Sequence, residues 1–107
     1  MHEARIVLTT VASTEKAEAL SKALVERRLA ACVNIIGPIR SIYRWKEKIE
    51  DEQEFLLVIK TTSERAADLQ AAFSELHPYE IPEHVELSIE GGGAEYLAWL
   101  AAQVTRK

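Results

Sequence analysis

Apolar residues recur along this chain with two spacings, one typical of strands and the other of helices. A strand is predicted where an apolar run begins at Ile6, and Ser13 follows in the position of an N-cap for a helix that extends to about Arg28. That helix carries an apolar stripe at i, i+3 and i+7, made of Ala17, Leu20 and Leu24. The pattern therefore predicts a strand followed by an amphipathic helix.

Residues 31–61 predict a long antiparallel hairpin. Two runs rich in Val, Ile, Leu and aromatic residues flank a charged segment, residues 46–54, which we expect to form a solvated tip. Gly37-Pro38 interrupts the first run and predicts a bend or bulge, because proline cannot donate to a strand ladder. Residues 55–59 are apolar at every position, which is typical of a strand covered on both faces.

The remainder of the chain predicts a helix, a strand and a final helix. Ser63 is placed to cap the helix, which should end before His77-Pro78 because the residue before a proline avoids the helical conformation. Residues 77–83 hold two of the three prolines and form a stiff loop. Alternation then predicts a half-buried strand through Val85, Leu87 and Ile89. Beyond three glycines, the last helix has an apolar stripe of Leu97, Leu100, Ala101 and Val104.

The order strand, helix, strand, strand, helix, strand, helix predicts an α+β fold. It corresponds to the ferredoxin-like split βαβ arrangement, βαββαβ, with one C-terminal helix added. We expect residues 1–107 to form a single domain. Such a short chain has too few helices to cover both faces of the sheet. We therefore expect copies of the same chain to cover the second face, and a pocket to lie where the copies meet.

Composition narrows the possible functions. The chain is 48% hydrophobic and 28% charged, as in ordinary globular proteins, and no apolar run approaches the ~20 residues of a membrane span. The first three residues lead straight into the first strand without the features of a signal peptide, so we expect a cytoplasmic location and no membrane partner. A net charge of −4 offers no attraction to nucleic acid. With Cys32 as the only cysteine, no intrachain disulfide is possible.

His77 is the most site-like single residue. It stands where a helix meets the proline-rich loop, and Tyr79, Glu80 and Glu83 follow closely. An imidazole near carboxylates could bind a divalent cation or move a proton. The alternative is that a protonated His77 only caps the helix C-terminus.

Cys32 and the hairpin aromatics each allow two interpretations. The Cys32 thiol in an apolar strand is either a small packing group or a soft ligand for Cu(I). Tyr43 and Trp45 project from one face of the hairpin, and they would lie near Lys60 and Glu54 if the strands paired about Asp51. They either line a cleft with His77 or pack at an interface.

Several ordered blocks resemble the CutA divalent-cation tolerance family. They are residues 30–34, 41–45, 48–50, 56–62 and 77–83, and the similarity continues to residues 96–100. The resemblance implies a compact cytoplasmic homotrimer of ferredoxin-like subunits whose sheets associate between subunits, similar in architecture to the PII signalling proteins. It also implies a role in tolerance to copper and other divalent cations, and it implies no reaction.

The resemblance also implies a set of site residues. The ligand pocket would contain Tyr43, Trp45, Lys60, His77, Tyr79 and Glu80, and the metal ligands would be His77 and Cys32. Some family members bind copper through a cysteine at the end of the first strand and a His-His pair before Pro-Tyr. Here Thr9 and Leu76-His77 occupy those places, so only His77 of that set remains. We therefore expect weak binding of copper or another divalent cation, and no organic cofactor.

Three functional hypotheses follow. The first is a non-enzymatic homotrimer of metal-ion homeostasis that binds a cation, or another small ligand, in clefts between subunits. The second is a PII-like signalling or scaffold trimer that binds a small ligand or presents its hairpins to a protein partner. The third is an enzyme in which His77 and Glu80 serve as acid and base.

Overall fold

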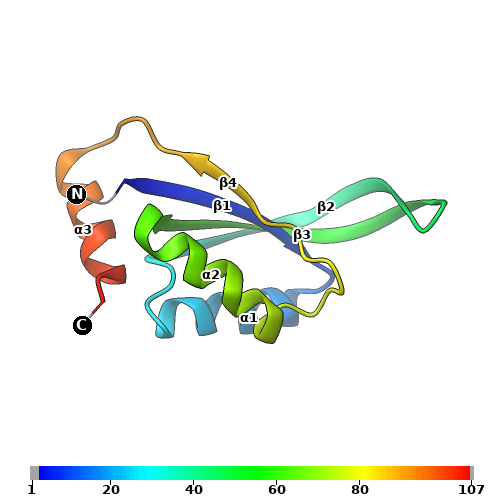
Figure 1. Cartoon of the computed structure of the whole chain (residues 1–107). Helices are drawn as coiled ribbons and strands as arrows, with labels where there is room; N and C mark the ends of the chain where they lie inside the picture. Colours follow the sequence, from blue (N-terminus) through cyan, green and yellow to red (C-terminus); the bar gives the residue numbers. More distant parts are fainter. Residues whose placement is uncertain (1–2, 107) are drawn as a thin grey trace.

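A computed structural model describes residues 3–106 and contains the elements in the predicted order (Figure 1). They are β1 (Ala4–Val11), α1 (Thr14–Glu26), β2 (Cys32–Trp45), β3 (Lys48–Thr62), α2 (Ser63–Leu76), β4 (Val85–Ser88) and α3 (Ala94–Val104). The four strands form one antiparallel sheet in the order β2-β3-β1-β4. The predicted α+β, ferredoxin-like fold is confirmed.

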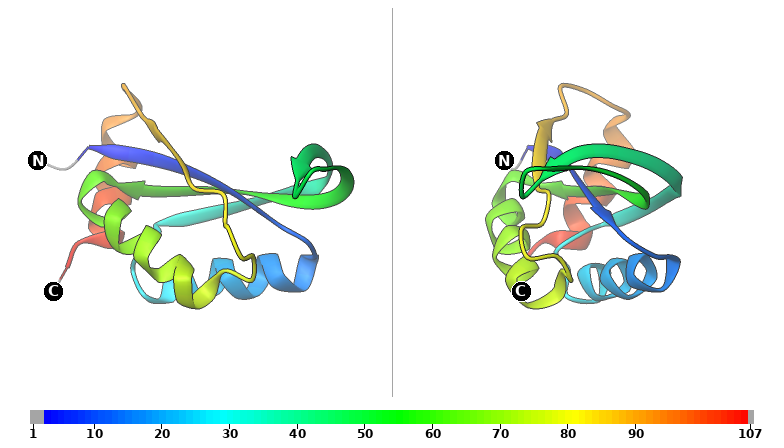
Figure 2. Two further views of the ribbon diagram at one scale, coloured as in Figure 1. Left: turned by 45° about the vertical axis from the view of Figure 1, so that its right-hand side comes forward. Right: turned by 90° about the vertical axis from the view of Figure 1, so that its right-hand side faces the viewer.

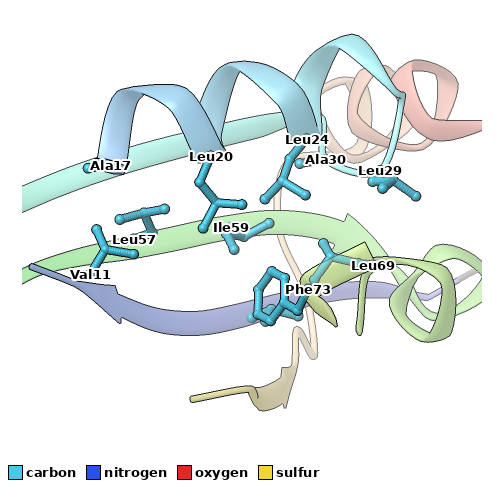
Figure 3. Close-up of a cluster of buried hydrophobic side chains, with 11 residues drawn as sticks. Val11, Ala17, Leu20, Leu24, Leu29, Ala30, Leu57, Ile59, Leu69 and Phe73 are labelled. Atoms are coloured by element: carbon cyan, nitrogen blue, oxygen red, sulfur yellow. The ribbon is translucent and has the colours of Figure 1, made fainter. Parts of the chain in front are cut away.

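The core lies between the sheet and the two helices α1 and α2, which cover the same face (Figures 1 and 3). Val7 and Val11 of β1 and Leu57 and Ile59 of β3 are fully buried there. Their helical partners are Leu20, Leu24, Leu69 and Phe73. Ser13 caps α1 as predicted, because its hydroxyl accepts a hydrogen bond from the Lys16 backbone nitrogen at 3.2 Å.

The opposite face of the sheet carries many apolar side chains, and residues 3–106 provide no comparable cover for it. Alternate strand residues point to opposite faces, so the neighbours of the buried residues lie on this second face. Helix α3 packs at the end where β1 begins and β3 ends, through Leu100 and Val104 (Figure 1). We call the remaining surface the open face; it includes Ile6, Leu8, Ile36, Leu56, Val58, Val85 and Leu87, which are half-buried or exposed.

Strand β4 differs from its prediction. We expected it to be half-buried, but all four residues, Val85–Ser88, are exposed. It is an edge strand, and its apolar side chains Val85 and Leu87 lie beside Leu8 and Ile6 on the open face. Their burial would require a further layer, which residues 3–106 do not provide.

The hairpin of β2 and β3 projects from the body of the molecule (Figure 1). Its turn is formed by Lys46 and Glu47, whose φ angles of 49° and 70° are both positive. The turn is shorter than the predicted tip of residues 46–54, and the predicted pairing about Asp51 is wrong, since β3 already begins at Lys48 and Asp51 lies opposite Ile42. Most of the charged residues of this segment are exposed as predicted, whereas Glu54 is buried. Two-residue turns of this kind usually contain Asn or Gly, and neither is present.

A bulge in β2 is confirmed. The register with β3 shifts between Ile36 and Ile39, around the cis Gly37–Pro38 bond. A Cβ atom at Gly37 would lie 2.6 Å from Cδ2 of Phe55, so this close approach requires glycine.

The expected cap of α2 is not formed. Ser63 is the first residue of α2 rather than its N-cap, and its hydroxyl accepts from the Glu3 backbone nitrogen at 3.3 Å. The N-cap is Thr62, which makes no side-chain capping bond. The predicted end of the helix before Pro78 is confirmed, since α2 ends at Leu76.

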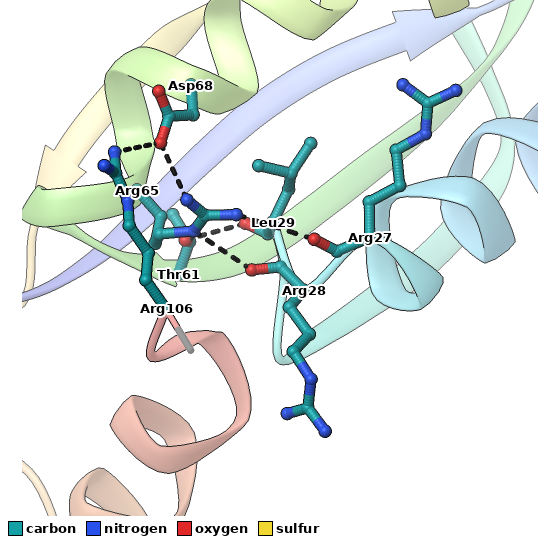
Figure 4. Close-up of polar contacts among 7 residues, drawn as sticks. All are labelled: Arg27, Arg28, Leu29, Thr61, Arg65, Asp68 and Arg106. Atoms are coloured by element: carbon teal, nitrogen blue, oxygen red, sulfur yellow. Dashed lines mark hydrogen bonds and ion pairs between the residues drawn. The ribbon is translucent and has the colours of Figure 1, made fainter.

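Arginine side chains join the ends of the three helices (Figure 4). Arg65 donates from Nε to the Arg28 carbonyl at 3.2 Å and from Nη1 to Asp68 at 2.7 Å. Arg106, which follows α3, also pairs with Asp68. Thr61 donates to the Leu29 carbonyl at 2.8 Å. These bonds satisfy carbonyl groups that the end of α1 and the following turn leave without helical partners.

Candidate functional site

A pocket of about 650 Å³ lies between the projecting hairpin and the loop of residues 77–83. Three aromatic side chains contribute to its walls: Tyr43, Trp45 and Tyr79. Five carboxylates also line it: Glu50, Glu52, Glu54, Glu80 and Glu83. The pocket is therefore both aromatic and strongly acidic.

The acidic wall follows from the geometry of β3. Glu50, Glu52 and Glu54 are two residues apart, so their side chains share one face of the strand. The register places Tyr43 directly opposite Glu50, and the Tyr43 hydroxyl donates to Glu52 at 3.2 Å. Burial, followed by this bond, raises the pKa of Tyr43.

Glu54 is the innermost carboxylate of the pocket, with 6% of its surface exposed. The Tyr79 hydroxyl donates to it at 2.6 Å. Within residues 3–106, Glu54 forms no ion pair. Burial, together with the hydrogen bond and charge of Glu54, raises the pKa of Tyr79. Burial and then the charge of Glu54 also raise the pKa of Glu83.

Lys46 lies at the rim of the pocket. The hairpin tip bends back towards the body of the molecule (Figure 2), and the Lys46 ammonium group is 3.6 Å from a Glu80 oxygen. The same ammonium group lies 5.4 Å from the centre of the Trp45 ring. One cation of the chain is thus held between a carboxylate and an aromatic ring at this site.

His77 lies behind the pocket and is buried. Its Nε2 is 2.9 Å from the Thr9 hydroxyl, and its Nδ1 accepts from the Tyr79 backbone nitrogen at 3.2 Å. Burial lowers the pKa of His77, which favours the neutral ring. With Nδ1 as an acceptor, the neutral ring carries its proton on Nε2. His77 thus fixes the start of the loop that carries Tyr79, and a protonated helix cap is not favoured.

Lys60 and Cys32 lie away from this pocket. They are directly opposite each other in β3 and β2. Lys60 stands between Ile59 and Thr61, both buried under the helices, so Lys60 and Cys32 lie on the open face. The Lys60 ammonium group is 5.9 Å from the ring centre of Tyr96 in α3.

The predicted site residues therefore separate into two places within one chain. Tyr43, Trp45, Tyr79 and Glu80 line one pocket, and His77 supports it from behind. Lys60 is not part of that pocket, because the hairpin pairs in another register than the one we expected. Cys32 and His77 lie on opposite faces of the sheet, since Thr9, which contacts His77, is on the helix-covered face.

A copper site built from His77 and Cys32 does not fit one chain. Both ring nitrogens of His77 already have partners, and Cys32 is on the other face. Within the part of the chain that the structure describes, no group of three or more His, Cys, Asp or Glu residues is placed to hold a metal ion.

Glu50 and Glu52 are pocket residues that sequence reasoning missed, and Glu54 was expected near Tyr43 and Trp45 but not as a buried carboxylate. The sequence interpretation assigned them to a solvated tip. Their alternation at every second position was the available signal, because it is the spacing of one strand face. In addition, no helix within residues 3–106 has the length and apolar character needed to cross a membrane.

Comparisons with known proteins agree over most of the chain. The family model described as CutA1 divalent ion tolerance protein matches residues 5–103. The chain is 50% identical over 95 residues to the divalent-cation tolerance protein CutA of Thermus thermophilus, covering 89% of this chain and 92% of that protein. The crystal structure of CutA from Xylella fastidiosa, at 35% identity, superimposes with a TM-score of 0.93 and covers 96% of this chain and 99% of the other.

Relatives differ in length and compartment. The CutA protein of Arabidopsis thaliana, named as chloroplastic, is 39% identical over 89% of this chain, which spans about half of that protein. The cytoplasmic location therefore stays a prediction. The family match and the high identity nevertheless extend over nearly all of the described residues. This chain belongs to the CutA1 divalent ion tolerance family.

Proposed function

We propose that this protein is a non-enzymatic homotrimer that supports tolerance to divalent cations by binding them weakly in clefts between subunits. The observation that carries the proposal is the open face of the sheet. Ile6, Leu8, Leu56, Val58 and Leu87 form a continuous apolar surface there, and within residues 3–106 Leu87 stays exposed while the other four are only half-buried. Large exposed apolar surfaces of this kind favour association.

Cation binding is proposed at the subunit boundary because one chain lacks a complete set of ligands. Within the described residues no three ligand side chains converge on one point. The carboxylates of the pocket, Glu50, Glu52 and Glu54, provide hard oxygen donors that a neighbouring subunit could complement. Weak affinity follows from ligands that are shared between chains.

Calorimetric titration with Cu(II), Zn(II) and Mg(II) tests this proposal. The unmodified protein should give saturable heat with at least one of these ions. Glu50→Gln should reduce the affinity, whereas Glu18→Gln, on the exposed side of α1, should not. No heat with any of the three ions would remove divalent metals as direct ligands of the protein.

A second candidate function is a PII-like signalling or scaffold trimer that binds a small organic ligand or a protein partner. The pocket of about 650 Å³ supports it, because small-molecule sites are usually about 300–1,000 Å³ and partly aromatic. An acid–base enzyme using His77 and Glu80 is less well supported. The ring nitrogens of His77 contact Thr9 and the Tyr79 backbone instead of the pocket.

A further inference from the structure

We propose that the pocket binds a linear polyamine, that is, an aliphatic chain carrying two or more ammonium groups. The proposal rests on the second candidate function, a site for a small organic ligand, and names the chemical class of that ligand. It does not depend on metal binding. Four features of the pocket support a polyamine ligand: its charge, its buried carboxylate, its aromatic walls and the spacing of its acids.

The charge of the pocket is strongly negative. Five carboxylates line it. Within residues 3–106, the only ion pair that any of them makes is the one between Glu80 and Lys46 at the rim. Anionic and neutral ligands would be repelled or would leave these charges unbalanced. The complementary ligand is a cation with more than one charge.

Glu54 is the part of the pocket that most requires a cation. Its side chain is almost fully buried, and Tyr79 is the residue that donates a hydrogen bond to it. A carboxylate removed from water is costly unless it is paired, and no Lys, Arg or His within residues 3–106 forms an ion pair with it. An ammonium group that entered the pocket would supply the missing charge.

The aromatic walls favour an organic ammonium group over a metal ion. Tyr43, Trp45 and Tyr79 present rings whose faces attract ammonium groups, whereas metal ions prefer converging oxygen, nitrogen or sulfur ligands. The Lys46 ammonium group, held between the Trp45 ring and Glu80, is an alkylammonium group already bound at this rim. A ligand with the same head group would use the same kind of contact.

The spacing of the acids favours a linear ligand with separated charges. Glu50, Glu52 and Glu54 share one strand face, and residues two apart in a strand are about 6.6 Å apart along it. Such a row cannot converge on a single ion. It matches ammonium groups that are separated by short aliphatic segments, and these segments would lie against Ile42 and the aromatic rings.

Fluorescence provides a direct assay with spermidine as the probe. The chain has two tryptophans, Trp45 in the pocket and Trp99 on α3, so Trp99→Phe leaves Trp45 as the single reporter. Spermidine should change the Trp45 emission in a saturable way at low salt, and calorimetry on the unmodified protein should give the same affinity. Glu52→Gln should weaken binding by about tenfold, the loss of one charge pair.

Glu47→Gln is the matched control. It removes the same charge from the exposed hairpin turn, outside the pocket lining, and should change the affinity less than about twofold. Circular dichroism and sedimentation should show that both variants keep the fold and assembly of the unmodified protein.

Two results would overturn the proposal: no saturable spermidine binding, or equal weakening by Glu47→Gln and Glu52→Gln. The second would mean attraction by net charge alone. If spermidine does not bind, but the metal titrations still give heat and the trimer persists, the polyamine site is rejected and the proposed cation-tolerance function stands. If spermidine binds but no metal ion gives heat, the proposed metal binding is rejected and the polyamine site stands.

Discussion

Replacing Tyr79 by phenylalanine removes one hydroxyl group and leaves the aromatic ring in place. That hydroxyl donates to the Glu54 carboxylate at 2.6 Å, and Glu54 is almost fully buried. Hydrogen bonds to charged groups contribute about 1.5–3 kcal/mol, and a buried acceptor that loses its donor also loses the compensation for its desolvation. We expect Tyr79→Phe to lower the free energy of unfolding by about 2–3 kcal/mol.

Tyr43→Phe is the control for this prediction. Tyr43 also donates to a glutamate, Glu52, but at 3.2 Å on the exposed hairpin, where water replaces the lost donor. We expect it to leave the unfolding midpoint nearly unchanged. Guanidinium unfolding should be followed by circular dichroism at one fixed chain concentration, since the stability of an oligomer depends on concentration.

A double-mutant cycle isolates the contact itself. Glu54→Gln removes the charge of the acceptor, so Tyr79→Phe should cost clearly less in that background than in the unmodified protein. If Tyr79→Phe and Tyr43→Phe are equally mild, or if the two changes at Tyr79 and Glu54 are additive, the buried hydrogen bond does not stabilise the pocket and our reasoning about it is wrong.

Three further predictions concern the rest of the fold. Leu57→Ala opens a cavity between the sheet and the helices and should cost about 2–5 kcal/mol in chemical denaturation, and a loss below 1 kcal/mol would contradict the assigned core. Arg65→Ala removes the bonds to the Arg28 carbonyl and Asp68 and should cost about 1–3 kcal/mol, whereas an unchanged midpoint would show that this junction is not stabilising. Burial lowers the pKa of both His77 and His84, so on acidification the unfolded chain takes up protons at a higher pH than the folded chain. The free energy of unfolding should therefore fall as the pH drops below about 6.5, and it should level off below the lowered pKa values of the folded chain. His84→Gln should flatten part of this slope, and equal slopes in both proteins would argue against a buried neutral His84.

The layered fold was predictable because its core obeys simple periodicity. Ala17, Leu20 and Leu24 repeat at helical spacing, and all three are buried against the sheet. The fully apolar run of residues 55–59 identified the central strand β3, whose Leu57 and Ile59 have no exposed surface. Each of these signals comes from residues that are close together in the sequence, and the packing between helices and sheet agrees with it.

The position of the hairpin turn was not predictable from the same kind of signal. Lys46 and Glu47 adopt positive φ angles without the Gly or Asn that usually marks such a turn. The charged residues that follow suggested a solvated tip, although they alternate within a strand. Because the register of a hairpin depends on its turn, this error also misplaced Lys60 relative to Tyr43.

The candidate site was predictable in part. Tyr43 and Trp45 share a strand face, and the proline-rich loop brings Tyr79 and Glu80 to the same pocket. The role of Glu54 depends on a tertiary contact with Tyr79, 25 residues away, which no local pattern encodes. His77 stood out in the sequence because of its place before the proline-rich loop, but its hydrogen bonds to Thr9 and the Tyr79 backbone could be assigned only in the folded chain.

The exposure of strand β4 and the proposed assembly have the same explanation, a second sheet face that is incompletely covered. Val85 and Leu87 alternate as in a half-buried strand, yet both are exposed in one chain. Their pattern fits a sheet whose second face is covered by something other than its own helices. Identical copies of the chain are the cover that we propose.

Sedimentation equilibrium at low micromolar chain concentration tests that central claim most directly. We predict a single species with three times the 12.0 kDa mass of the chain, and no folded monomer. Leu56→Glu, on the open face, should dissociate it, while Glu18→Gln on the outer side of α1 should not. A well-folded 12.0 kDa species that unfolds cooperatively under the same conditions would contradict the account.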